Sequence, residues 1–573
     1  MEKFSISTLR TMYLEGETTP KKVINEIIKN AKADEEDNIW IIKPDLEWIN
    51  PYLEVLGKRS IFECPLWGIP FAIKDNIDLK ELPTTAACPQ FSYIPKEDAV
   101  VVRRLIEAGA IPIGKTNMDQ FATGLVGTRS PYGEVRNALK GELISGGSSS
   151  GSAVAVAKGL AVFSLGTDTA GSGRVPAALN RLIGLKPAVG AWPGEGMVKA
   201  CASLDCITVF ANTLEDAYLV DEVVRGKELD DEWSRNSIYP NAVLPKKVLI
   251  PQTELQFYGD YGEKYKEAWN HALDRIKRLG IPIEKFDYTF VSEAAKLLYE
   301  GPCVAERWAE LGEFVSKNEK DVFPVTAQIL KSSLKKDYDA ADVYKTLHTL
   351  QKYKKKLWNL LKGSVLLLPT CGGTFTREQV DANPIETNSQ MGLYTNHCNL
   401  LDLAAIAVPG DDIVEDVPFG VTFFATSEEE GLVKGIAEKF LKEETTLVAV
   451  CGLHMRGFPL EMQMKSMGAI FVREAKTAEK YRMFCLKTIP EKPGLVKDKE
   501  GNKISVEIWK MPIKQFGKFV TMIQEPLGIG KVELEDGTKV NGFIYDRNPN
   551  VPCKEITQYG GWRKFKDCYK NYE

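Results

Sequence analysis

Two short loops rich in glycine and serine contain the residues best suited to covalent chemistry. The first spans residues 145–152 (SGGSSSGS) and the second, after one apolar run, spans residues 166–174 (GTDTAGSGR). Glycine and serine in such proportions also form flexible linkers, but here apolar segments flank the loops. Small residues on both sides of a buried element indicate a backbone that closely approaches a ligand. A serine hydroxyl in such a loop is a candidate nucleophile if a nearby base takes its proton.

Two further motifs occur upstream of these loops: residues 68–76 (GIPFAIKDN) and residues 114–117 (GKTN). Together with the loops they form a set of long, ordered motifs between residues 68 and 187. This set resembles the amidase signature family. The resemblance implies hydrolysis of a linear amide and an α/β/α sandwich with a mixed central sheet.

The resemblance also implies a Ser-cisSer-Lys triad, with Ser172 as nucleophile, Ser148 as the serine with a cis peptide bond and Lys74 as base. A lysine amine is a base only when uncharged, so its pKa must fall from about 10.4 toward neutrality. Burial without a carboxylate partner produces such a shift. Ser148 would then relay a proton from Ser172 to Lys74. A histidine base has little support, because all four histidines lie outside both loops: His271, His348, His397 and His454.

The second loop also offers donors for the negative charge that develops on the attacked oxygen. Thr169, Ala170 and Gly171 precede the candidate nucleophile and supply consecutive backbone N–H groups. Loss of one such donor typically raises the barrier by about 3–4 kcal/mol. We expect Asp168 to hold the loop rather than to react.

Residues 109–116 formally match the phosphate-binding pattern G-x-x-x-x-G-K-[ST]. A loop of this type must follow a strand and begin a helix. Here residues 99–107 are typical of a helix and residues 111–113 of a strand, and Pro112 lacks a backbone N–H. Because the order of the elements is reversed, we expect no ATP site.

Three further stretches narrow the resemblance to the allophanate hydrolase subfamily: residues 119–127 (DQFATGLVG), 298–302 (LYEGP) and 389–396 (SQMGLYTN). This implies hydrolysis of allophanate to ammonia and N-carboxycarbamate in urea degradation, without a metal or other cofactor. Allophanate is a small anion, and an arginine can hold its carboxylate with two parallel hydrogen bonds. The substrate-binding residues implied by the resemblance are Gly124, Tyr299 and Arg307.

Four stretches near the C-terminus resemble the C-terminal domain of the same subfamily: residues 452–460, 477–482, 492–494 and 526–530. That domain is similar in fold to gamma-glutamyl cyclotransferases and is thought to assist decarboxylation of N-carboxycarbamate. His454 occupies the place of the histidine implicated in that step. The chain departs from the family pattern at Glu461, where an asparagine is common, and this affects the details of anion binding.

The elements that must position these residues follow an α/β pattern. Residues 20–31 and 214–225 are typical of helices, and residues 248–251 and 365–369 of buried strands. From residue 67 to 213 apolar segments alternate with glycine-rich turns, which indicates alternating strands and helices.

A new series of short alternating segments begins after residue 445, which indicates a second, smaller and β-rich domain. We therefore expect an amidase signature domain at 1–445, a gamma-glutamyl-cyclotransferase-like domain at 446–546, and a polar tail or linker at 547–573.

The bulk composition argues against several other classes of protein. A chain of 573 residues with a formal charge of −5 has no broad basic surface, so nucleic acid is a poor candidate partner. The N-terminus lacks the apolar core of a signal peptide, and no apolar run approaches the roughly 18–20 residues that cross a bilayer. The eleven cysteines are scattered without a Cys-x-x-Cys pair, which favours a reducing compartment. We expect a cytoplasmic protein.

The resemblance implies a homodimer and a functional link to urea carboxylase. Residues 556–563 (ITQYGGWR) resemble the junction into urea carboxylase in fused fungal urea amidolyases, so both a free-standing enzyme and a part of a fusion remain open. Two alternatives also remain: another amidase-signature enzyme, such as a broad-specificity amidase or the component of an amidotransferase that modifies charged tRNA, and an inactive amidase-like binding protein. The filled triad positions argue against the second alternative.

Overall fold

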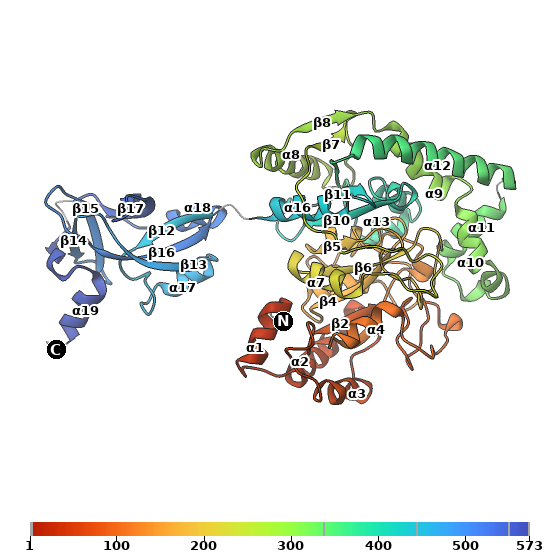
Figure 1. Ribbon diagram of the computed structural model, residues 1–573, viewed down its shortest axis with the longest axis horizontal. Coiled ribbons are helices and arrows are strands. Elements are labelled where there is room, and N and C mark those ends of the chain that lie inside the picture. The colour runs from red at the N-terminus through yellow and green to blue at the C-terminus, as the bar shows by residue number, and fades with distance from the viewer. Residues whose placement is uncertain (1–3, 336–337, 443–444, 548–550, 571–573) are drawn as a thin grey trace. The chain divides into compact units, whose positions relative to one another are not determined.

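The computed structural model describes residues 4–335, 338–442, 445–547 and 551–570 (Figure 1). It divides into two compact units, Met1–Leu441 and Lys442–Glu573.

The first unit is built around one mixed sheet of 11 strands, in the order β1-β3-β2-β4-β6-β5-β10-β11-β9-β7-β8. The strands are β1 (Trp40–Ile42), β2 (Pro70–Lys74), β3 (Ile111–Thr116), β4 (Phe163–Asp168), β5 (Ile183–Lys186), β6 (Cys206–Ala211), β7 (Val248–Pro251), β8 (Ile283–Phe286), β9 (Val365–Pro369), β10 (Leu403–Pro409) and β11 (Gly420–Thr426). β2 runs parallel to β3 and β4, whereas β4, β6, β5, β10, β11 and β9 pair antiparallel in turn. The predicted α/β class with a mixed sheet is confirmed, as are the strands at 248–251 and 365–369.

Helices connect these strands. They are α1 (Ile6–Leu14), α2 (Pro20–Ala33), α3 (Leu46–Leu56), α4 (Val100–Glu107), α5 (Ser150–Ala157), α6 (Val175–Leu179), α7 (Leu214–Val224), α8 (Gly262–Arg278), α9 (Thr289–Glu300), α10 (Val304–Lys317), α11 (Pro324–Lys335), α12 (Ala340–Leu361), α13 (Arg377–Ala382), α14 (Glu386–Met391), α15 (His397–Leu400) and α16 (Glu430–Leu441). The helices predicted at 20–31, 99–107 and 214–225 correspond to α2, α4 and α7. α2 begins after Thr19, whose hydroxyl accepts from the N–H of Lys22. None of the helices in the described ranges has the length and apolar character required to span a bilayer.

Both faces of the sheet are buried against apolar side chains. Successive residues of a strand point to opposite faces, and in β11 Phe423 and Phe424 belong to different hydrophobic clusters. Residues of α16, including Ile436, contribute to the first cluster, and residues of α9, including Val291, to the second. Different helices therefore cover the two faces, and each face of the sheet packs against its own hydrophobic cluster.

The sheet order brings the candidate catalytic segments together. β2 and β4 are parallel neighbours, with Ile73 paired to Leu165, so their carboxyl ends lie at the same edge of the sheet. β2 ends at Lys74 and β4 ends at Asp168, immediately before the second loop. α5, which follows Ser148, packs against both strands. Adjacent parallel strands that end together commonly form the reactive edge of an α/β sheet.

The pattern at residues 109–116 has the order expected from the sequence, with α4 before it and β3 within it. Lys115 is fully buried, lies 3.4 Å from the carboxylate of Asp75 and donates to the hydroxyl of Thr84 at 3.0 Å. A lysine held in this way inside a strand supports the sheet and is not available to a nucleotide.

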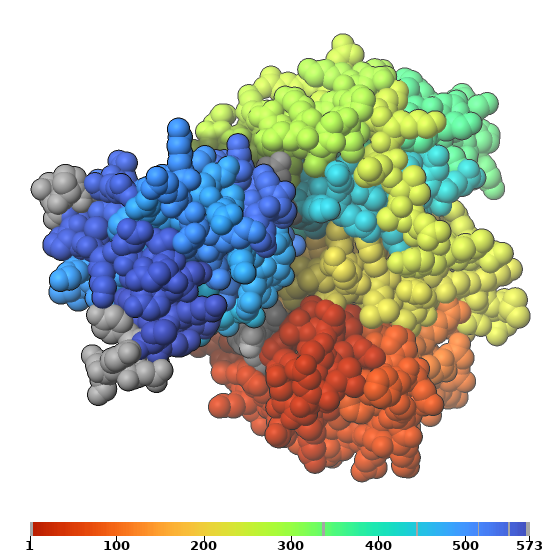
Figure 2. Space-filling model, turned by 60° about the vertical axis from the view of Figure 1, so that its left-hand side comes forward, coloured from red at the N-terminus to blue at the C-terminus, as the bar shows by residue number. Residues whose placement is uncertain are grey.

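The second unit, coloured in shades of blue in Figure 2, is β-rich, as predicted. It contains a five-stranded sheet in the order β13-β16-β12-β18-β17 and a three-stranded sheet in the order β15-β14-β19. The strands are β12 (Thr445–Val450), β13 (Ile470–Lys476), β14 (Tyr481–Leu486), β15 (Lys492–Lys497), β16 (Ser505–Pro512), β17 (Leu527–Glu533), β18 (Lys539–Tyr545) and β19 (Cys553–Glu555), and the helices are α17 (Glu461–Ser466), α18 (Ile513–Thr521) and α19 (Trp562–Lys570).

The segment interpreted from the sequence as a tail or linker, 547–573, contains folded structure in its described part, and that interpretation is corrected here. β19 pairs with β14, and Ile556, Trp562 and Phe565 are buried in the core of the second unit. The sequence obscured this packing because these apolar residues are separated by polar ones. Only when α19 forms do Trp562 and Phe565 share one face.

Candidate active site

Lys74 lies at the end of β2, fully buried, in contact with two hydroxyl groups. Its Nζ is 2.8 Å from Oγ of Ser148 and 2.6 Å from Oγ1 of Thr167. The peptide bond between Gly147 and Ser148 is cis, as the resemblance to the amidase signature family implied. The contact places the candidate base directly beside the candidate relay serine.

The environment of Lys74 favours its uncharged form. Burial lowers the pKa of Lys74 to about 7, and the more distant carboxylates of Asp119, Asp205 and Asp168 oppose this shift. In the described part of the chain no carboxylate forms an ion pair with this amine. An amine that loses its proton near pH 7 can accept one from a serine hydroxyl.

Ser172 lies in the loop after β4 and is almost completely buried. The loop turns sharply after it, since the N–H groups of Arg174 and Val175 both donate to the carbonyl of Gly171, at 2.9 and 2.8 Å. Within the described residues Ser172 makes no hydrogen bond to Ser148. The structure therefore contains the first link of the proposed relay, between Lys74 and Ser148, but not the second.

Asp168 holds this loop in place, as expected. Its carboxylate accepts two hydrogen bonds of 2.9 Å from the guanidinium of Arg174 and one of 3.0 Å from the N–H of Gly173. Although burial opposes the shift, the charge of Arg174 lowers the pKa of Asp168. Arg174 also donates to the carbonyl of Thr395 at 3.2 Å, so this buried ion pair ties the loop to the segment before α15.

The three candidate oxyanion residues have a geometry that leaves donors available. In the described part of the chain, the N–H groups of Thr169, Ala170 and Gly171, and that of Ser172, have no hydrogen-bond acceptor. Gly171 has a φ of +147°, and a Cβ there would lie 2.3 Å from Oγ1 of Thr395. The hydroxyl of Thr169 donates to Asp205, which anchors the beginning of the loop. Unpaired N–H groups beside a nucleophile can stabilise a developing oxyanion.

The predicted substrate-binding residues also lie together. Arg307, on α10, is fully buried and donates to the hydroxyls of Thr123 at 3.1 Å and Tyr299 at 3.2 Å. Its guanidinium lies 5.2 Å from the centre of the Tyr299 ring. Gly124 follows Thr123 in the chain, and a Cβ there would lie 2.5 Å from Oδ2 of Asp119. Arg307 has no acidic partner within the described residues, so it is a buried cation suited to an anionic ligand.

Sequence reasoning missed several residues that support the site. Thr167 contacts the lysine amine, and Asp205 anchors the oxyanion loop. Asp119 links two loops, because its N–H donates to the carbonyl of Ser148 at 3.0 Å. Its carboxylate accepts from the N–H groups of Gly127 and Arg129. The position of Asp119 inside one of the recognised stretches was the only available signal, because its partners lie elsewhere in the chain.

His454 lies in the second unit, at a cavity of about 200 Å³. Its Nε2 is 2.7 Å from the amide oxygen of Gln463, and its ring stacks on Phe543 with centroids 5.0 Å apart. Burial, assisted by Lys492, lowers the pKa of His454. Glu461 does not line this cavity; it accepts from the N–H of Gly457 at 2.8 Å instead.

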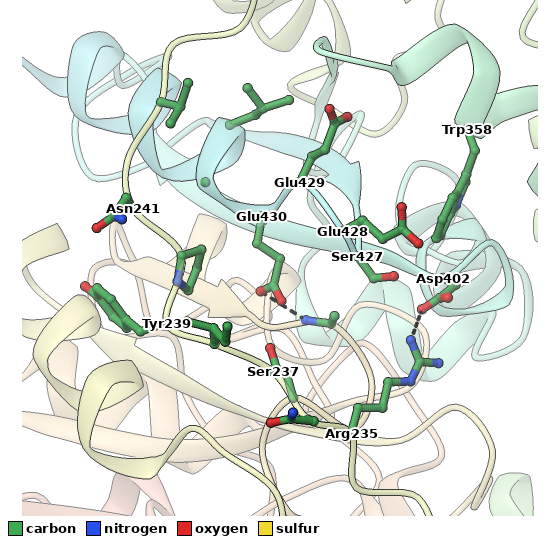
Figure 3. Close-up of a pocket in the computed structure, with 18 of the residues that line it drawn as sticks. Arg235, Ser237, Tyr239, Asn241, Trp358, Asp402, Ser427, Glu428, Glu429 and Glu430 are labelled. Carbon is green, nitrogen blue, oxygen red and sulfur yellow. Dashed lines mark hydrogen bonds and ion pairs between the residues drawn. The ribbon is translucent and has the colours of Figure 1, made fainter.

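A surface cavity of about 940 Å³ lies in the first unit between the segment 235–243 and the start of α16 (Figure 3). Four of its charged side chains form ion pairs: Arg235 lies 2.9 Å and Lys354 2.6 Å from Asp402, and Glu430 lies 2.9 Å from Arg225. Glu429, which also lines the cavity, accepts from the N–H of Gly363 at 3.0 Å. No triad residue lines it. Despite its size, this cavity offers no nucleophile with a base, and we assign no reaction to it.

The chain as described in the four ranges also contains no group of three His, Cys, Asp or Glu side chains that could hold a metal ion.

Comparison with known proteins agrees with this geometry. The family model described as Amidase matches residues 23–433, and the model described as Allophanate hydrolase C-terminal domain matches residues 446–567. The chain therefore belongs to the amidase family.

More narrowly, the chain is an amidase-family member of the allophanate hydrolase type. It is 36% identical to the solved allophanate hydrolase of Kluyveromyces lactis, with a TM-score of 0.72 and 99% of both chains covered. It is 39% identical to the urea amidolyase of Lachancea kluyveri over 97% of this chain but only 33% of that protein. The urea amidolyase of Saccharomyces cerevisiae is 38% identical over 96% of this chain and 32% of its own length. The chain thus spans about a third of the length of these two relatives.

Proposed function

We propose that this chain hydrolyses allophanate to ammonia and N-carboxycarbamate in the degradation of urea. The observation that carries the proposal is the contact of 2.8 Å between the buried amine of Lys74 and the hydroxyl of Ser148. A buried lysine whose partners are hydroxyls rather than carboxylates is suited to act as a base. The unpaired guanidinium of Arg307 supports an anionic substrate.

In the proposed reaction Ser172 attacks the terminal amide carbonyl of allophanate. Its proton passes to Ser148, and the proton of Ser148 passes to Lys74. Collapse of the tetrahedral intermediate breaks the C–N bond, and the proton held on Lys74 returns through Ser148 to the leaving nitrogen, which departs as ammonia. Water then attacks the acyl-enzyme while its proton passes through Ser148 to Lys74. The bond between the acyl carbon and Oγ of Ser172 breaks, the proton returns through Ser148 to this oxygen, and N-carboxycarbamate is released. The N–H groups of Thr169, Ala170 and Gly171, together with that of Ser172, are the proposed donors to the oxyanion.

Arg307 and Tyr299 are the proposed ligands of the substrate carboxylate, with Gly124 as part of the same pocket. A buried guanidinium gains most from an ionised partner, because the low local dielectric strengthens the attraction. A neutral amide lacks that partner, so the pocket favours an amide that carries a neighbouring carboxylate.

We further propose that the second unit, with a fold similar to gamma-glutamyl cyclotransferases, assists decarboxylation of N-carboxycarbamate at the cavity that contains His454. Loss of CO2 breaks the bond from nitrogen to carbon and requires a proton at that nitrogen, which a histidine can supply or position. The test uses the full chain: with ¹³C-labelled allophanate, His454→Ala should release ammonia from the first step at an unchanged initial rate and accumulate N-carboxycarbamate. Time courses identical to those of the wild type would favour a scaffolding role.

We propose a functional link to urea carboxylase, supported by the likeness to the urea amidolyase of Lachancea kluyveri, of which the matched region is 33%. We propose that this chain acts after such a carboxylase, either as part of a fusion or as a separate enzyme. The α/β/α sandwich as the detailed architecture of the first unit, the homodimer and the cytoplasmic location stay predictions.

The direct test is an ammonia-release assay that compares allophanate with simple neutral amides. We expect a kcat/KM for allophanate that exceeds the others by about 10²-fold or more, since a site built to pair a charged group rejects analogues that lack it. Comparable rates with simple amides would instead indicate a broad-specificity amidase. No ammonia from any amide would favour an inactive binding protein.

A further inference from the structure

A second buried arginine lies close to Arg307. Arg129 is 1% exposed, and its Nη1 and Nη2 donate to the backbone carbonyls of Thr123 at 2.9 Å and Pro384 at 2.6 Å. Among the described residues neither Arg129 nor Arg307 forms an ion pair, and the Nε of each is buried without a hydrogen-bond partner. Carbonyl and hydroxyl oxygens carry no net charge, so neither guanidinium has an ionised partner in direct contact, although the carboxylates of Asp119, Asp205 and Glu306 act on them at longer range. A buried cation in such surroundings gains from an anion placed beside it.

Thr123 connects the two arginines. Its carbonyl accepts from Arg129, while its hydroxyl accepts from Nη1 of Arg307 at 3.1 Å and donates to the carbonyl of Phe121 at 3.1 Å. Because the hydroxyl donates its single hydrogen to the carbonyl of Phe121, a lone pair of its oxygen faces Arg307. The orientation of Arg307 therefore depends on how Thr123 is held.

The backbone around Thr123 requires such restraint. Phe121 and Ala122 both have a φ of +53°, a left-handed conformation that non-glycine residues rarely adopt. Two such residues in succession persist only where surrounding contacts determine the conformation. Arg129 supplies one of these contacts with its side chain and another with its backbone, since its carbonyl accepts from the N–H of Gln120 at 2.8 Å.

The same residue is connected to the triad. The N–H of Arg129 donates to Oδ1 of Asp119 at 2.9 Å, and the N–H of Asp119 donates to the carbonyl of Ser148 at 3.0 Å. A continuous path of hydrogen bonds thus runs from Ser148 through Asp119, Arg129 and Thr123 to Arg307. The relay serine and the proposed carboxylate-binding group are set relative to each other by this path.

We propose that Arg129 is a positioning residue that determines substrate specificity: it holds Thr123, and through it Arg307, and adds a second positive charge beside the proposed anion pocket. The inference rests on the proposed function, because it takes Arg307 as the ligand of the substrate carboxylate. Arg129 then favours amides with a neighbouring carboxylate over neutral amides of the same shape. A residue that only stabilised the fold would affect both kinds of substrate alike.

Allophanate and biuret form a suitable pair of substrates, because biuret has a neutral carboxamide in place of the carboxylate. With Arg129→Met we expect kcat/KM for allophanate to fall about tenfold or more, mainly through KM, and that for biuret to change less than about threefold, as expected when a charge-assisted interaction is lost. Where biuret reacts too slowly, its inhibition constant against allophanate replaces kcat/KM. Thr123→Val removes the hydroxyl that orients Arg307 but no charge, and should shift the ratio in the same direction.

The matched control is Arg136→Met, since Arg136 forms an exposed ion pair with Glu36 at 3.3 Å; it should leave the ratio unchanged. Equal losses for both substrates, or an unchanged ratio in Arg129→Met, would overturn the proposal. If circular dichroism shows that Arg129→Met does not fold, Thr123→Val decides, and an unchanged ratio there overturns the proposal as well.

If the wild type hydrolyses other amides but not allophanate, the proposed function fails, and the comparison of malonamate with malonamide tests Arg129 in the same way. If the wild type prefers the anion in neither pair of substrates, the inference is overturned.

Discussion

The amine of Lys74 and the hydroxyl of Ser148 lie 2.8 Å apart in the interior of the first unit. The distance is that of a strong hydrogen bond, and both groups are removed from water. Since β2 ends at Lys74, a strand paired on both sides, with β3 and β4, holds the amine in place. This contact links a base with a depressed pKa to a hydroxyl that can pass a proton onward, and several consequences can be measured.

The activity should rise with pH through the range of the lysine titration. Burial lowers the pKa of Lys74 from 10.5 to about 7, and only the uncharged amine accepts a proton, so the active form increases as the pH rises above about 7. A profile of kcat/KM against pH for allophanate checks this. Lys74→Met should reduce kcat by about 10²–10⁴-fold, the range for loss of a general base. An ascending limb near pH 10 would show that the lysine pKa is not depressed.

Ser172→Ala should abolish turnover and leave the fold intact. The substitution removes only the attacking oxygen, and the hydroxyl of Ser172 makes no hydrogen bond to Ser148 on which packing depends. Thermal melting should therefore match the wild type, while ammonia release falls to the background rate. An active Ser172→Ala enzyme would refute the assignment of the nucleophile.

Asp168→Asn should destabilise the protein, because it leaves the buried guanidinium of Arg174 without its ionised partner. Breaking a buried pair in this way typically costs about 3–5 kcal/mol. Urea denaturation provides the measurement. The double variant Asp168→Asn, Arg174→Met should recover part of the lost stability. A loss in the double variant equal to the sum of the losses in Asp168→Asn and Arg174→Met alone would contradict the pairing.

Gly171→Ala should impair catalysis through the oxyanion loop. The new methyl group would meet Thr395 at 2.3 Å, in a backbone conformation that alanine disfavours. Displacement of the N–H donors should lower kcat by about 10²-fold or more. Gly141→Ala is the matched control, since a Cβ there meets nothing within 4 Å. Equal kinetics in the two variants would exclude a role for the Gly171 conformation.

Arg307→Ala should raise KM for allophanate steeply, by about 10-fold to 10²-fold, because one charged hydrogen-bonding partner of the carboxylate is lost. Rates with a neutral amide should change little. Steady-state kinetics on both substrates separates these effects. Unchanged kinetics with allophanate would remove Arg307 from the substrate pocket.

Local patterns determined much of what the sequence could show. The strands at 248–251 and 365–369 are short apolar runs, and burial of such runs needs no knowledge of their neighbours in the sheet. The identities of Lys74, Ser148 and Ser172 came from ordered motifs. The cis bond before Ser148 was anticipated for the same reason.

Only the tertiary structure decided how these residues are supported. The contact of Thr167 with Lys74 and the path through Asp119 and Arg129 depend on pairing between β2 and β4 and on loops far apart in the chain. The segment 551–570, polar in composition, was found to fold because its few apolar residues become neighbours once a helix forms. Spacing along a chain specifies which face a side chain occupies within one element. The partner across a sheet or between loops is specified by the packing of the whole unit. Only that packing shows that the buried guanidinium of Arg307 contacts hydroxyl groups and no carboxylate among the described residues.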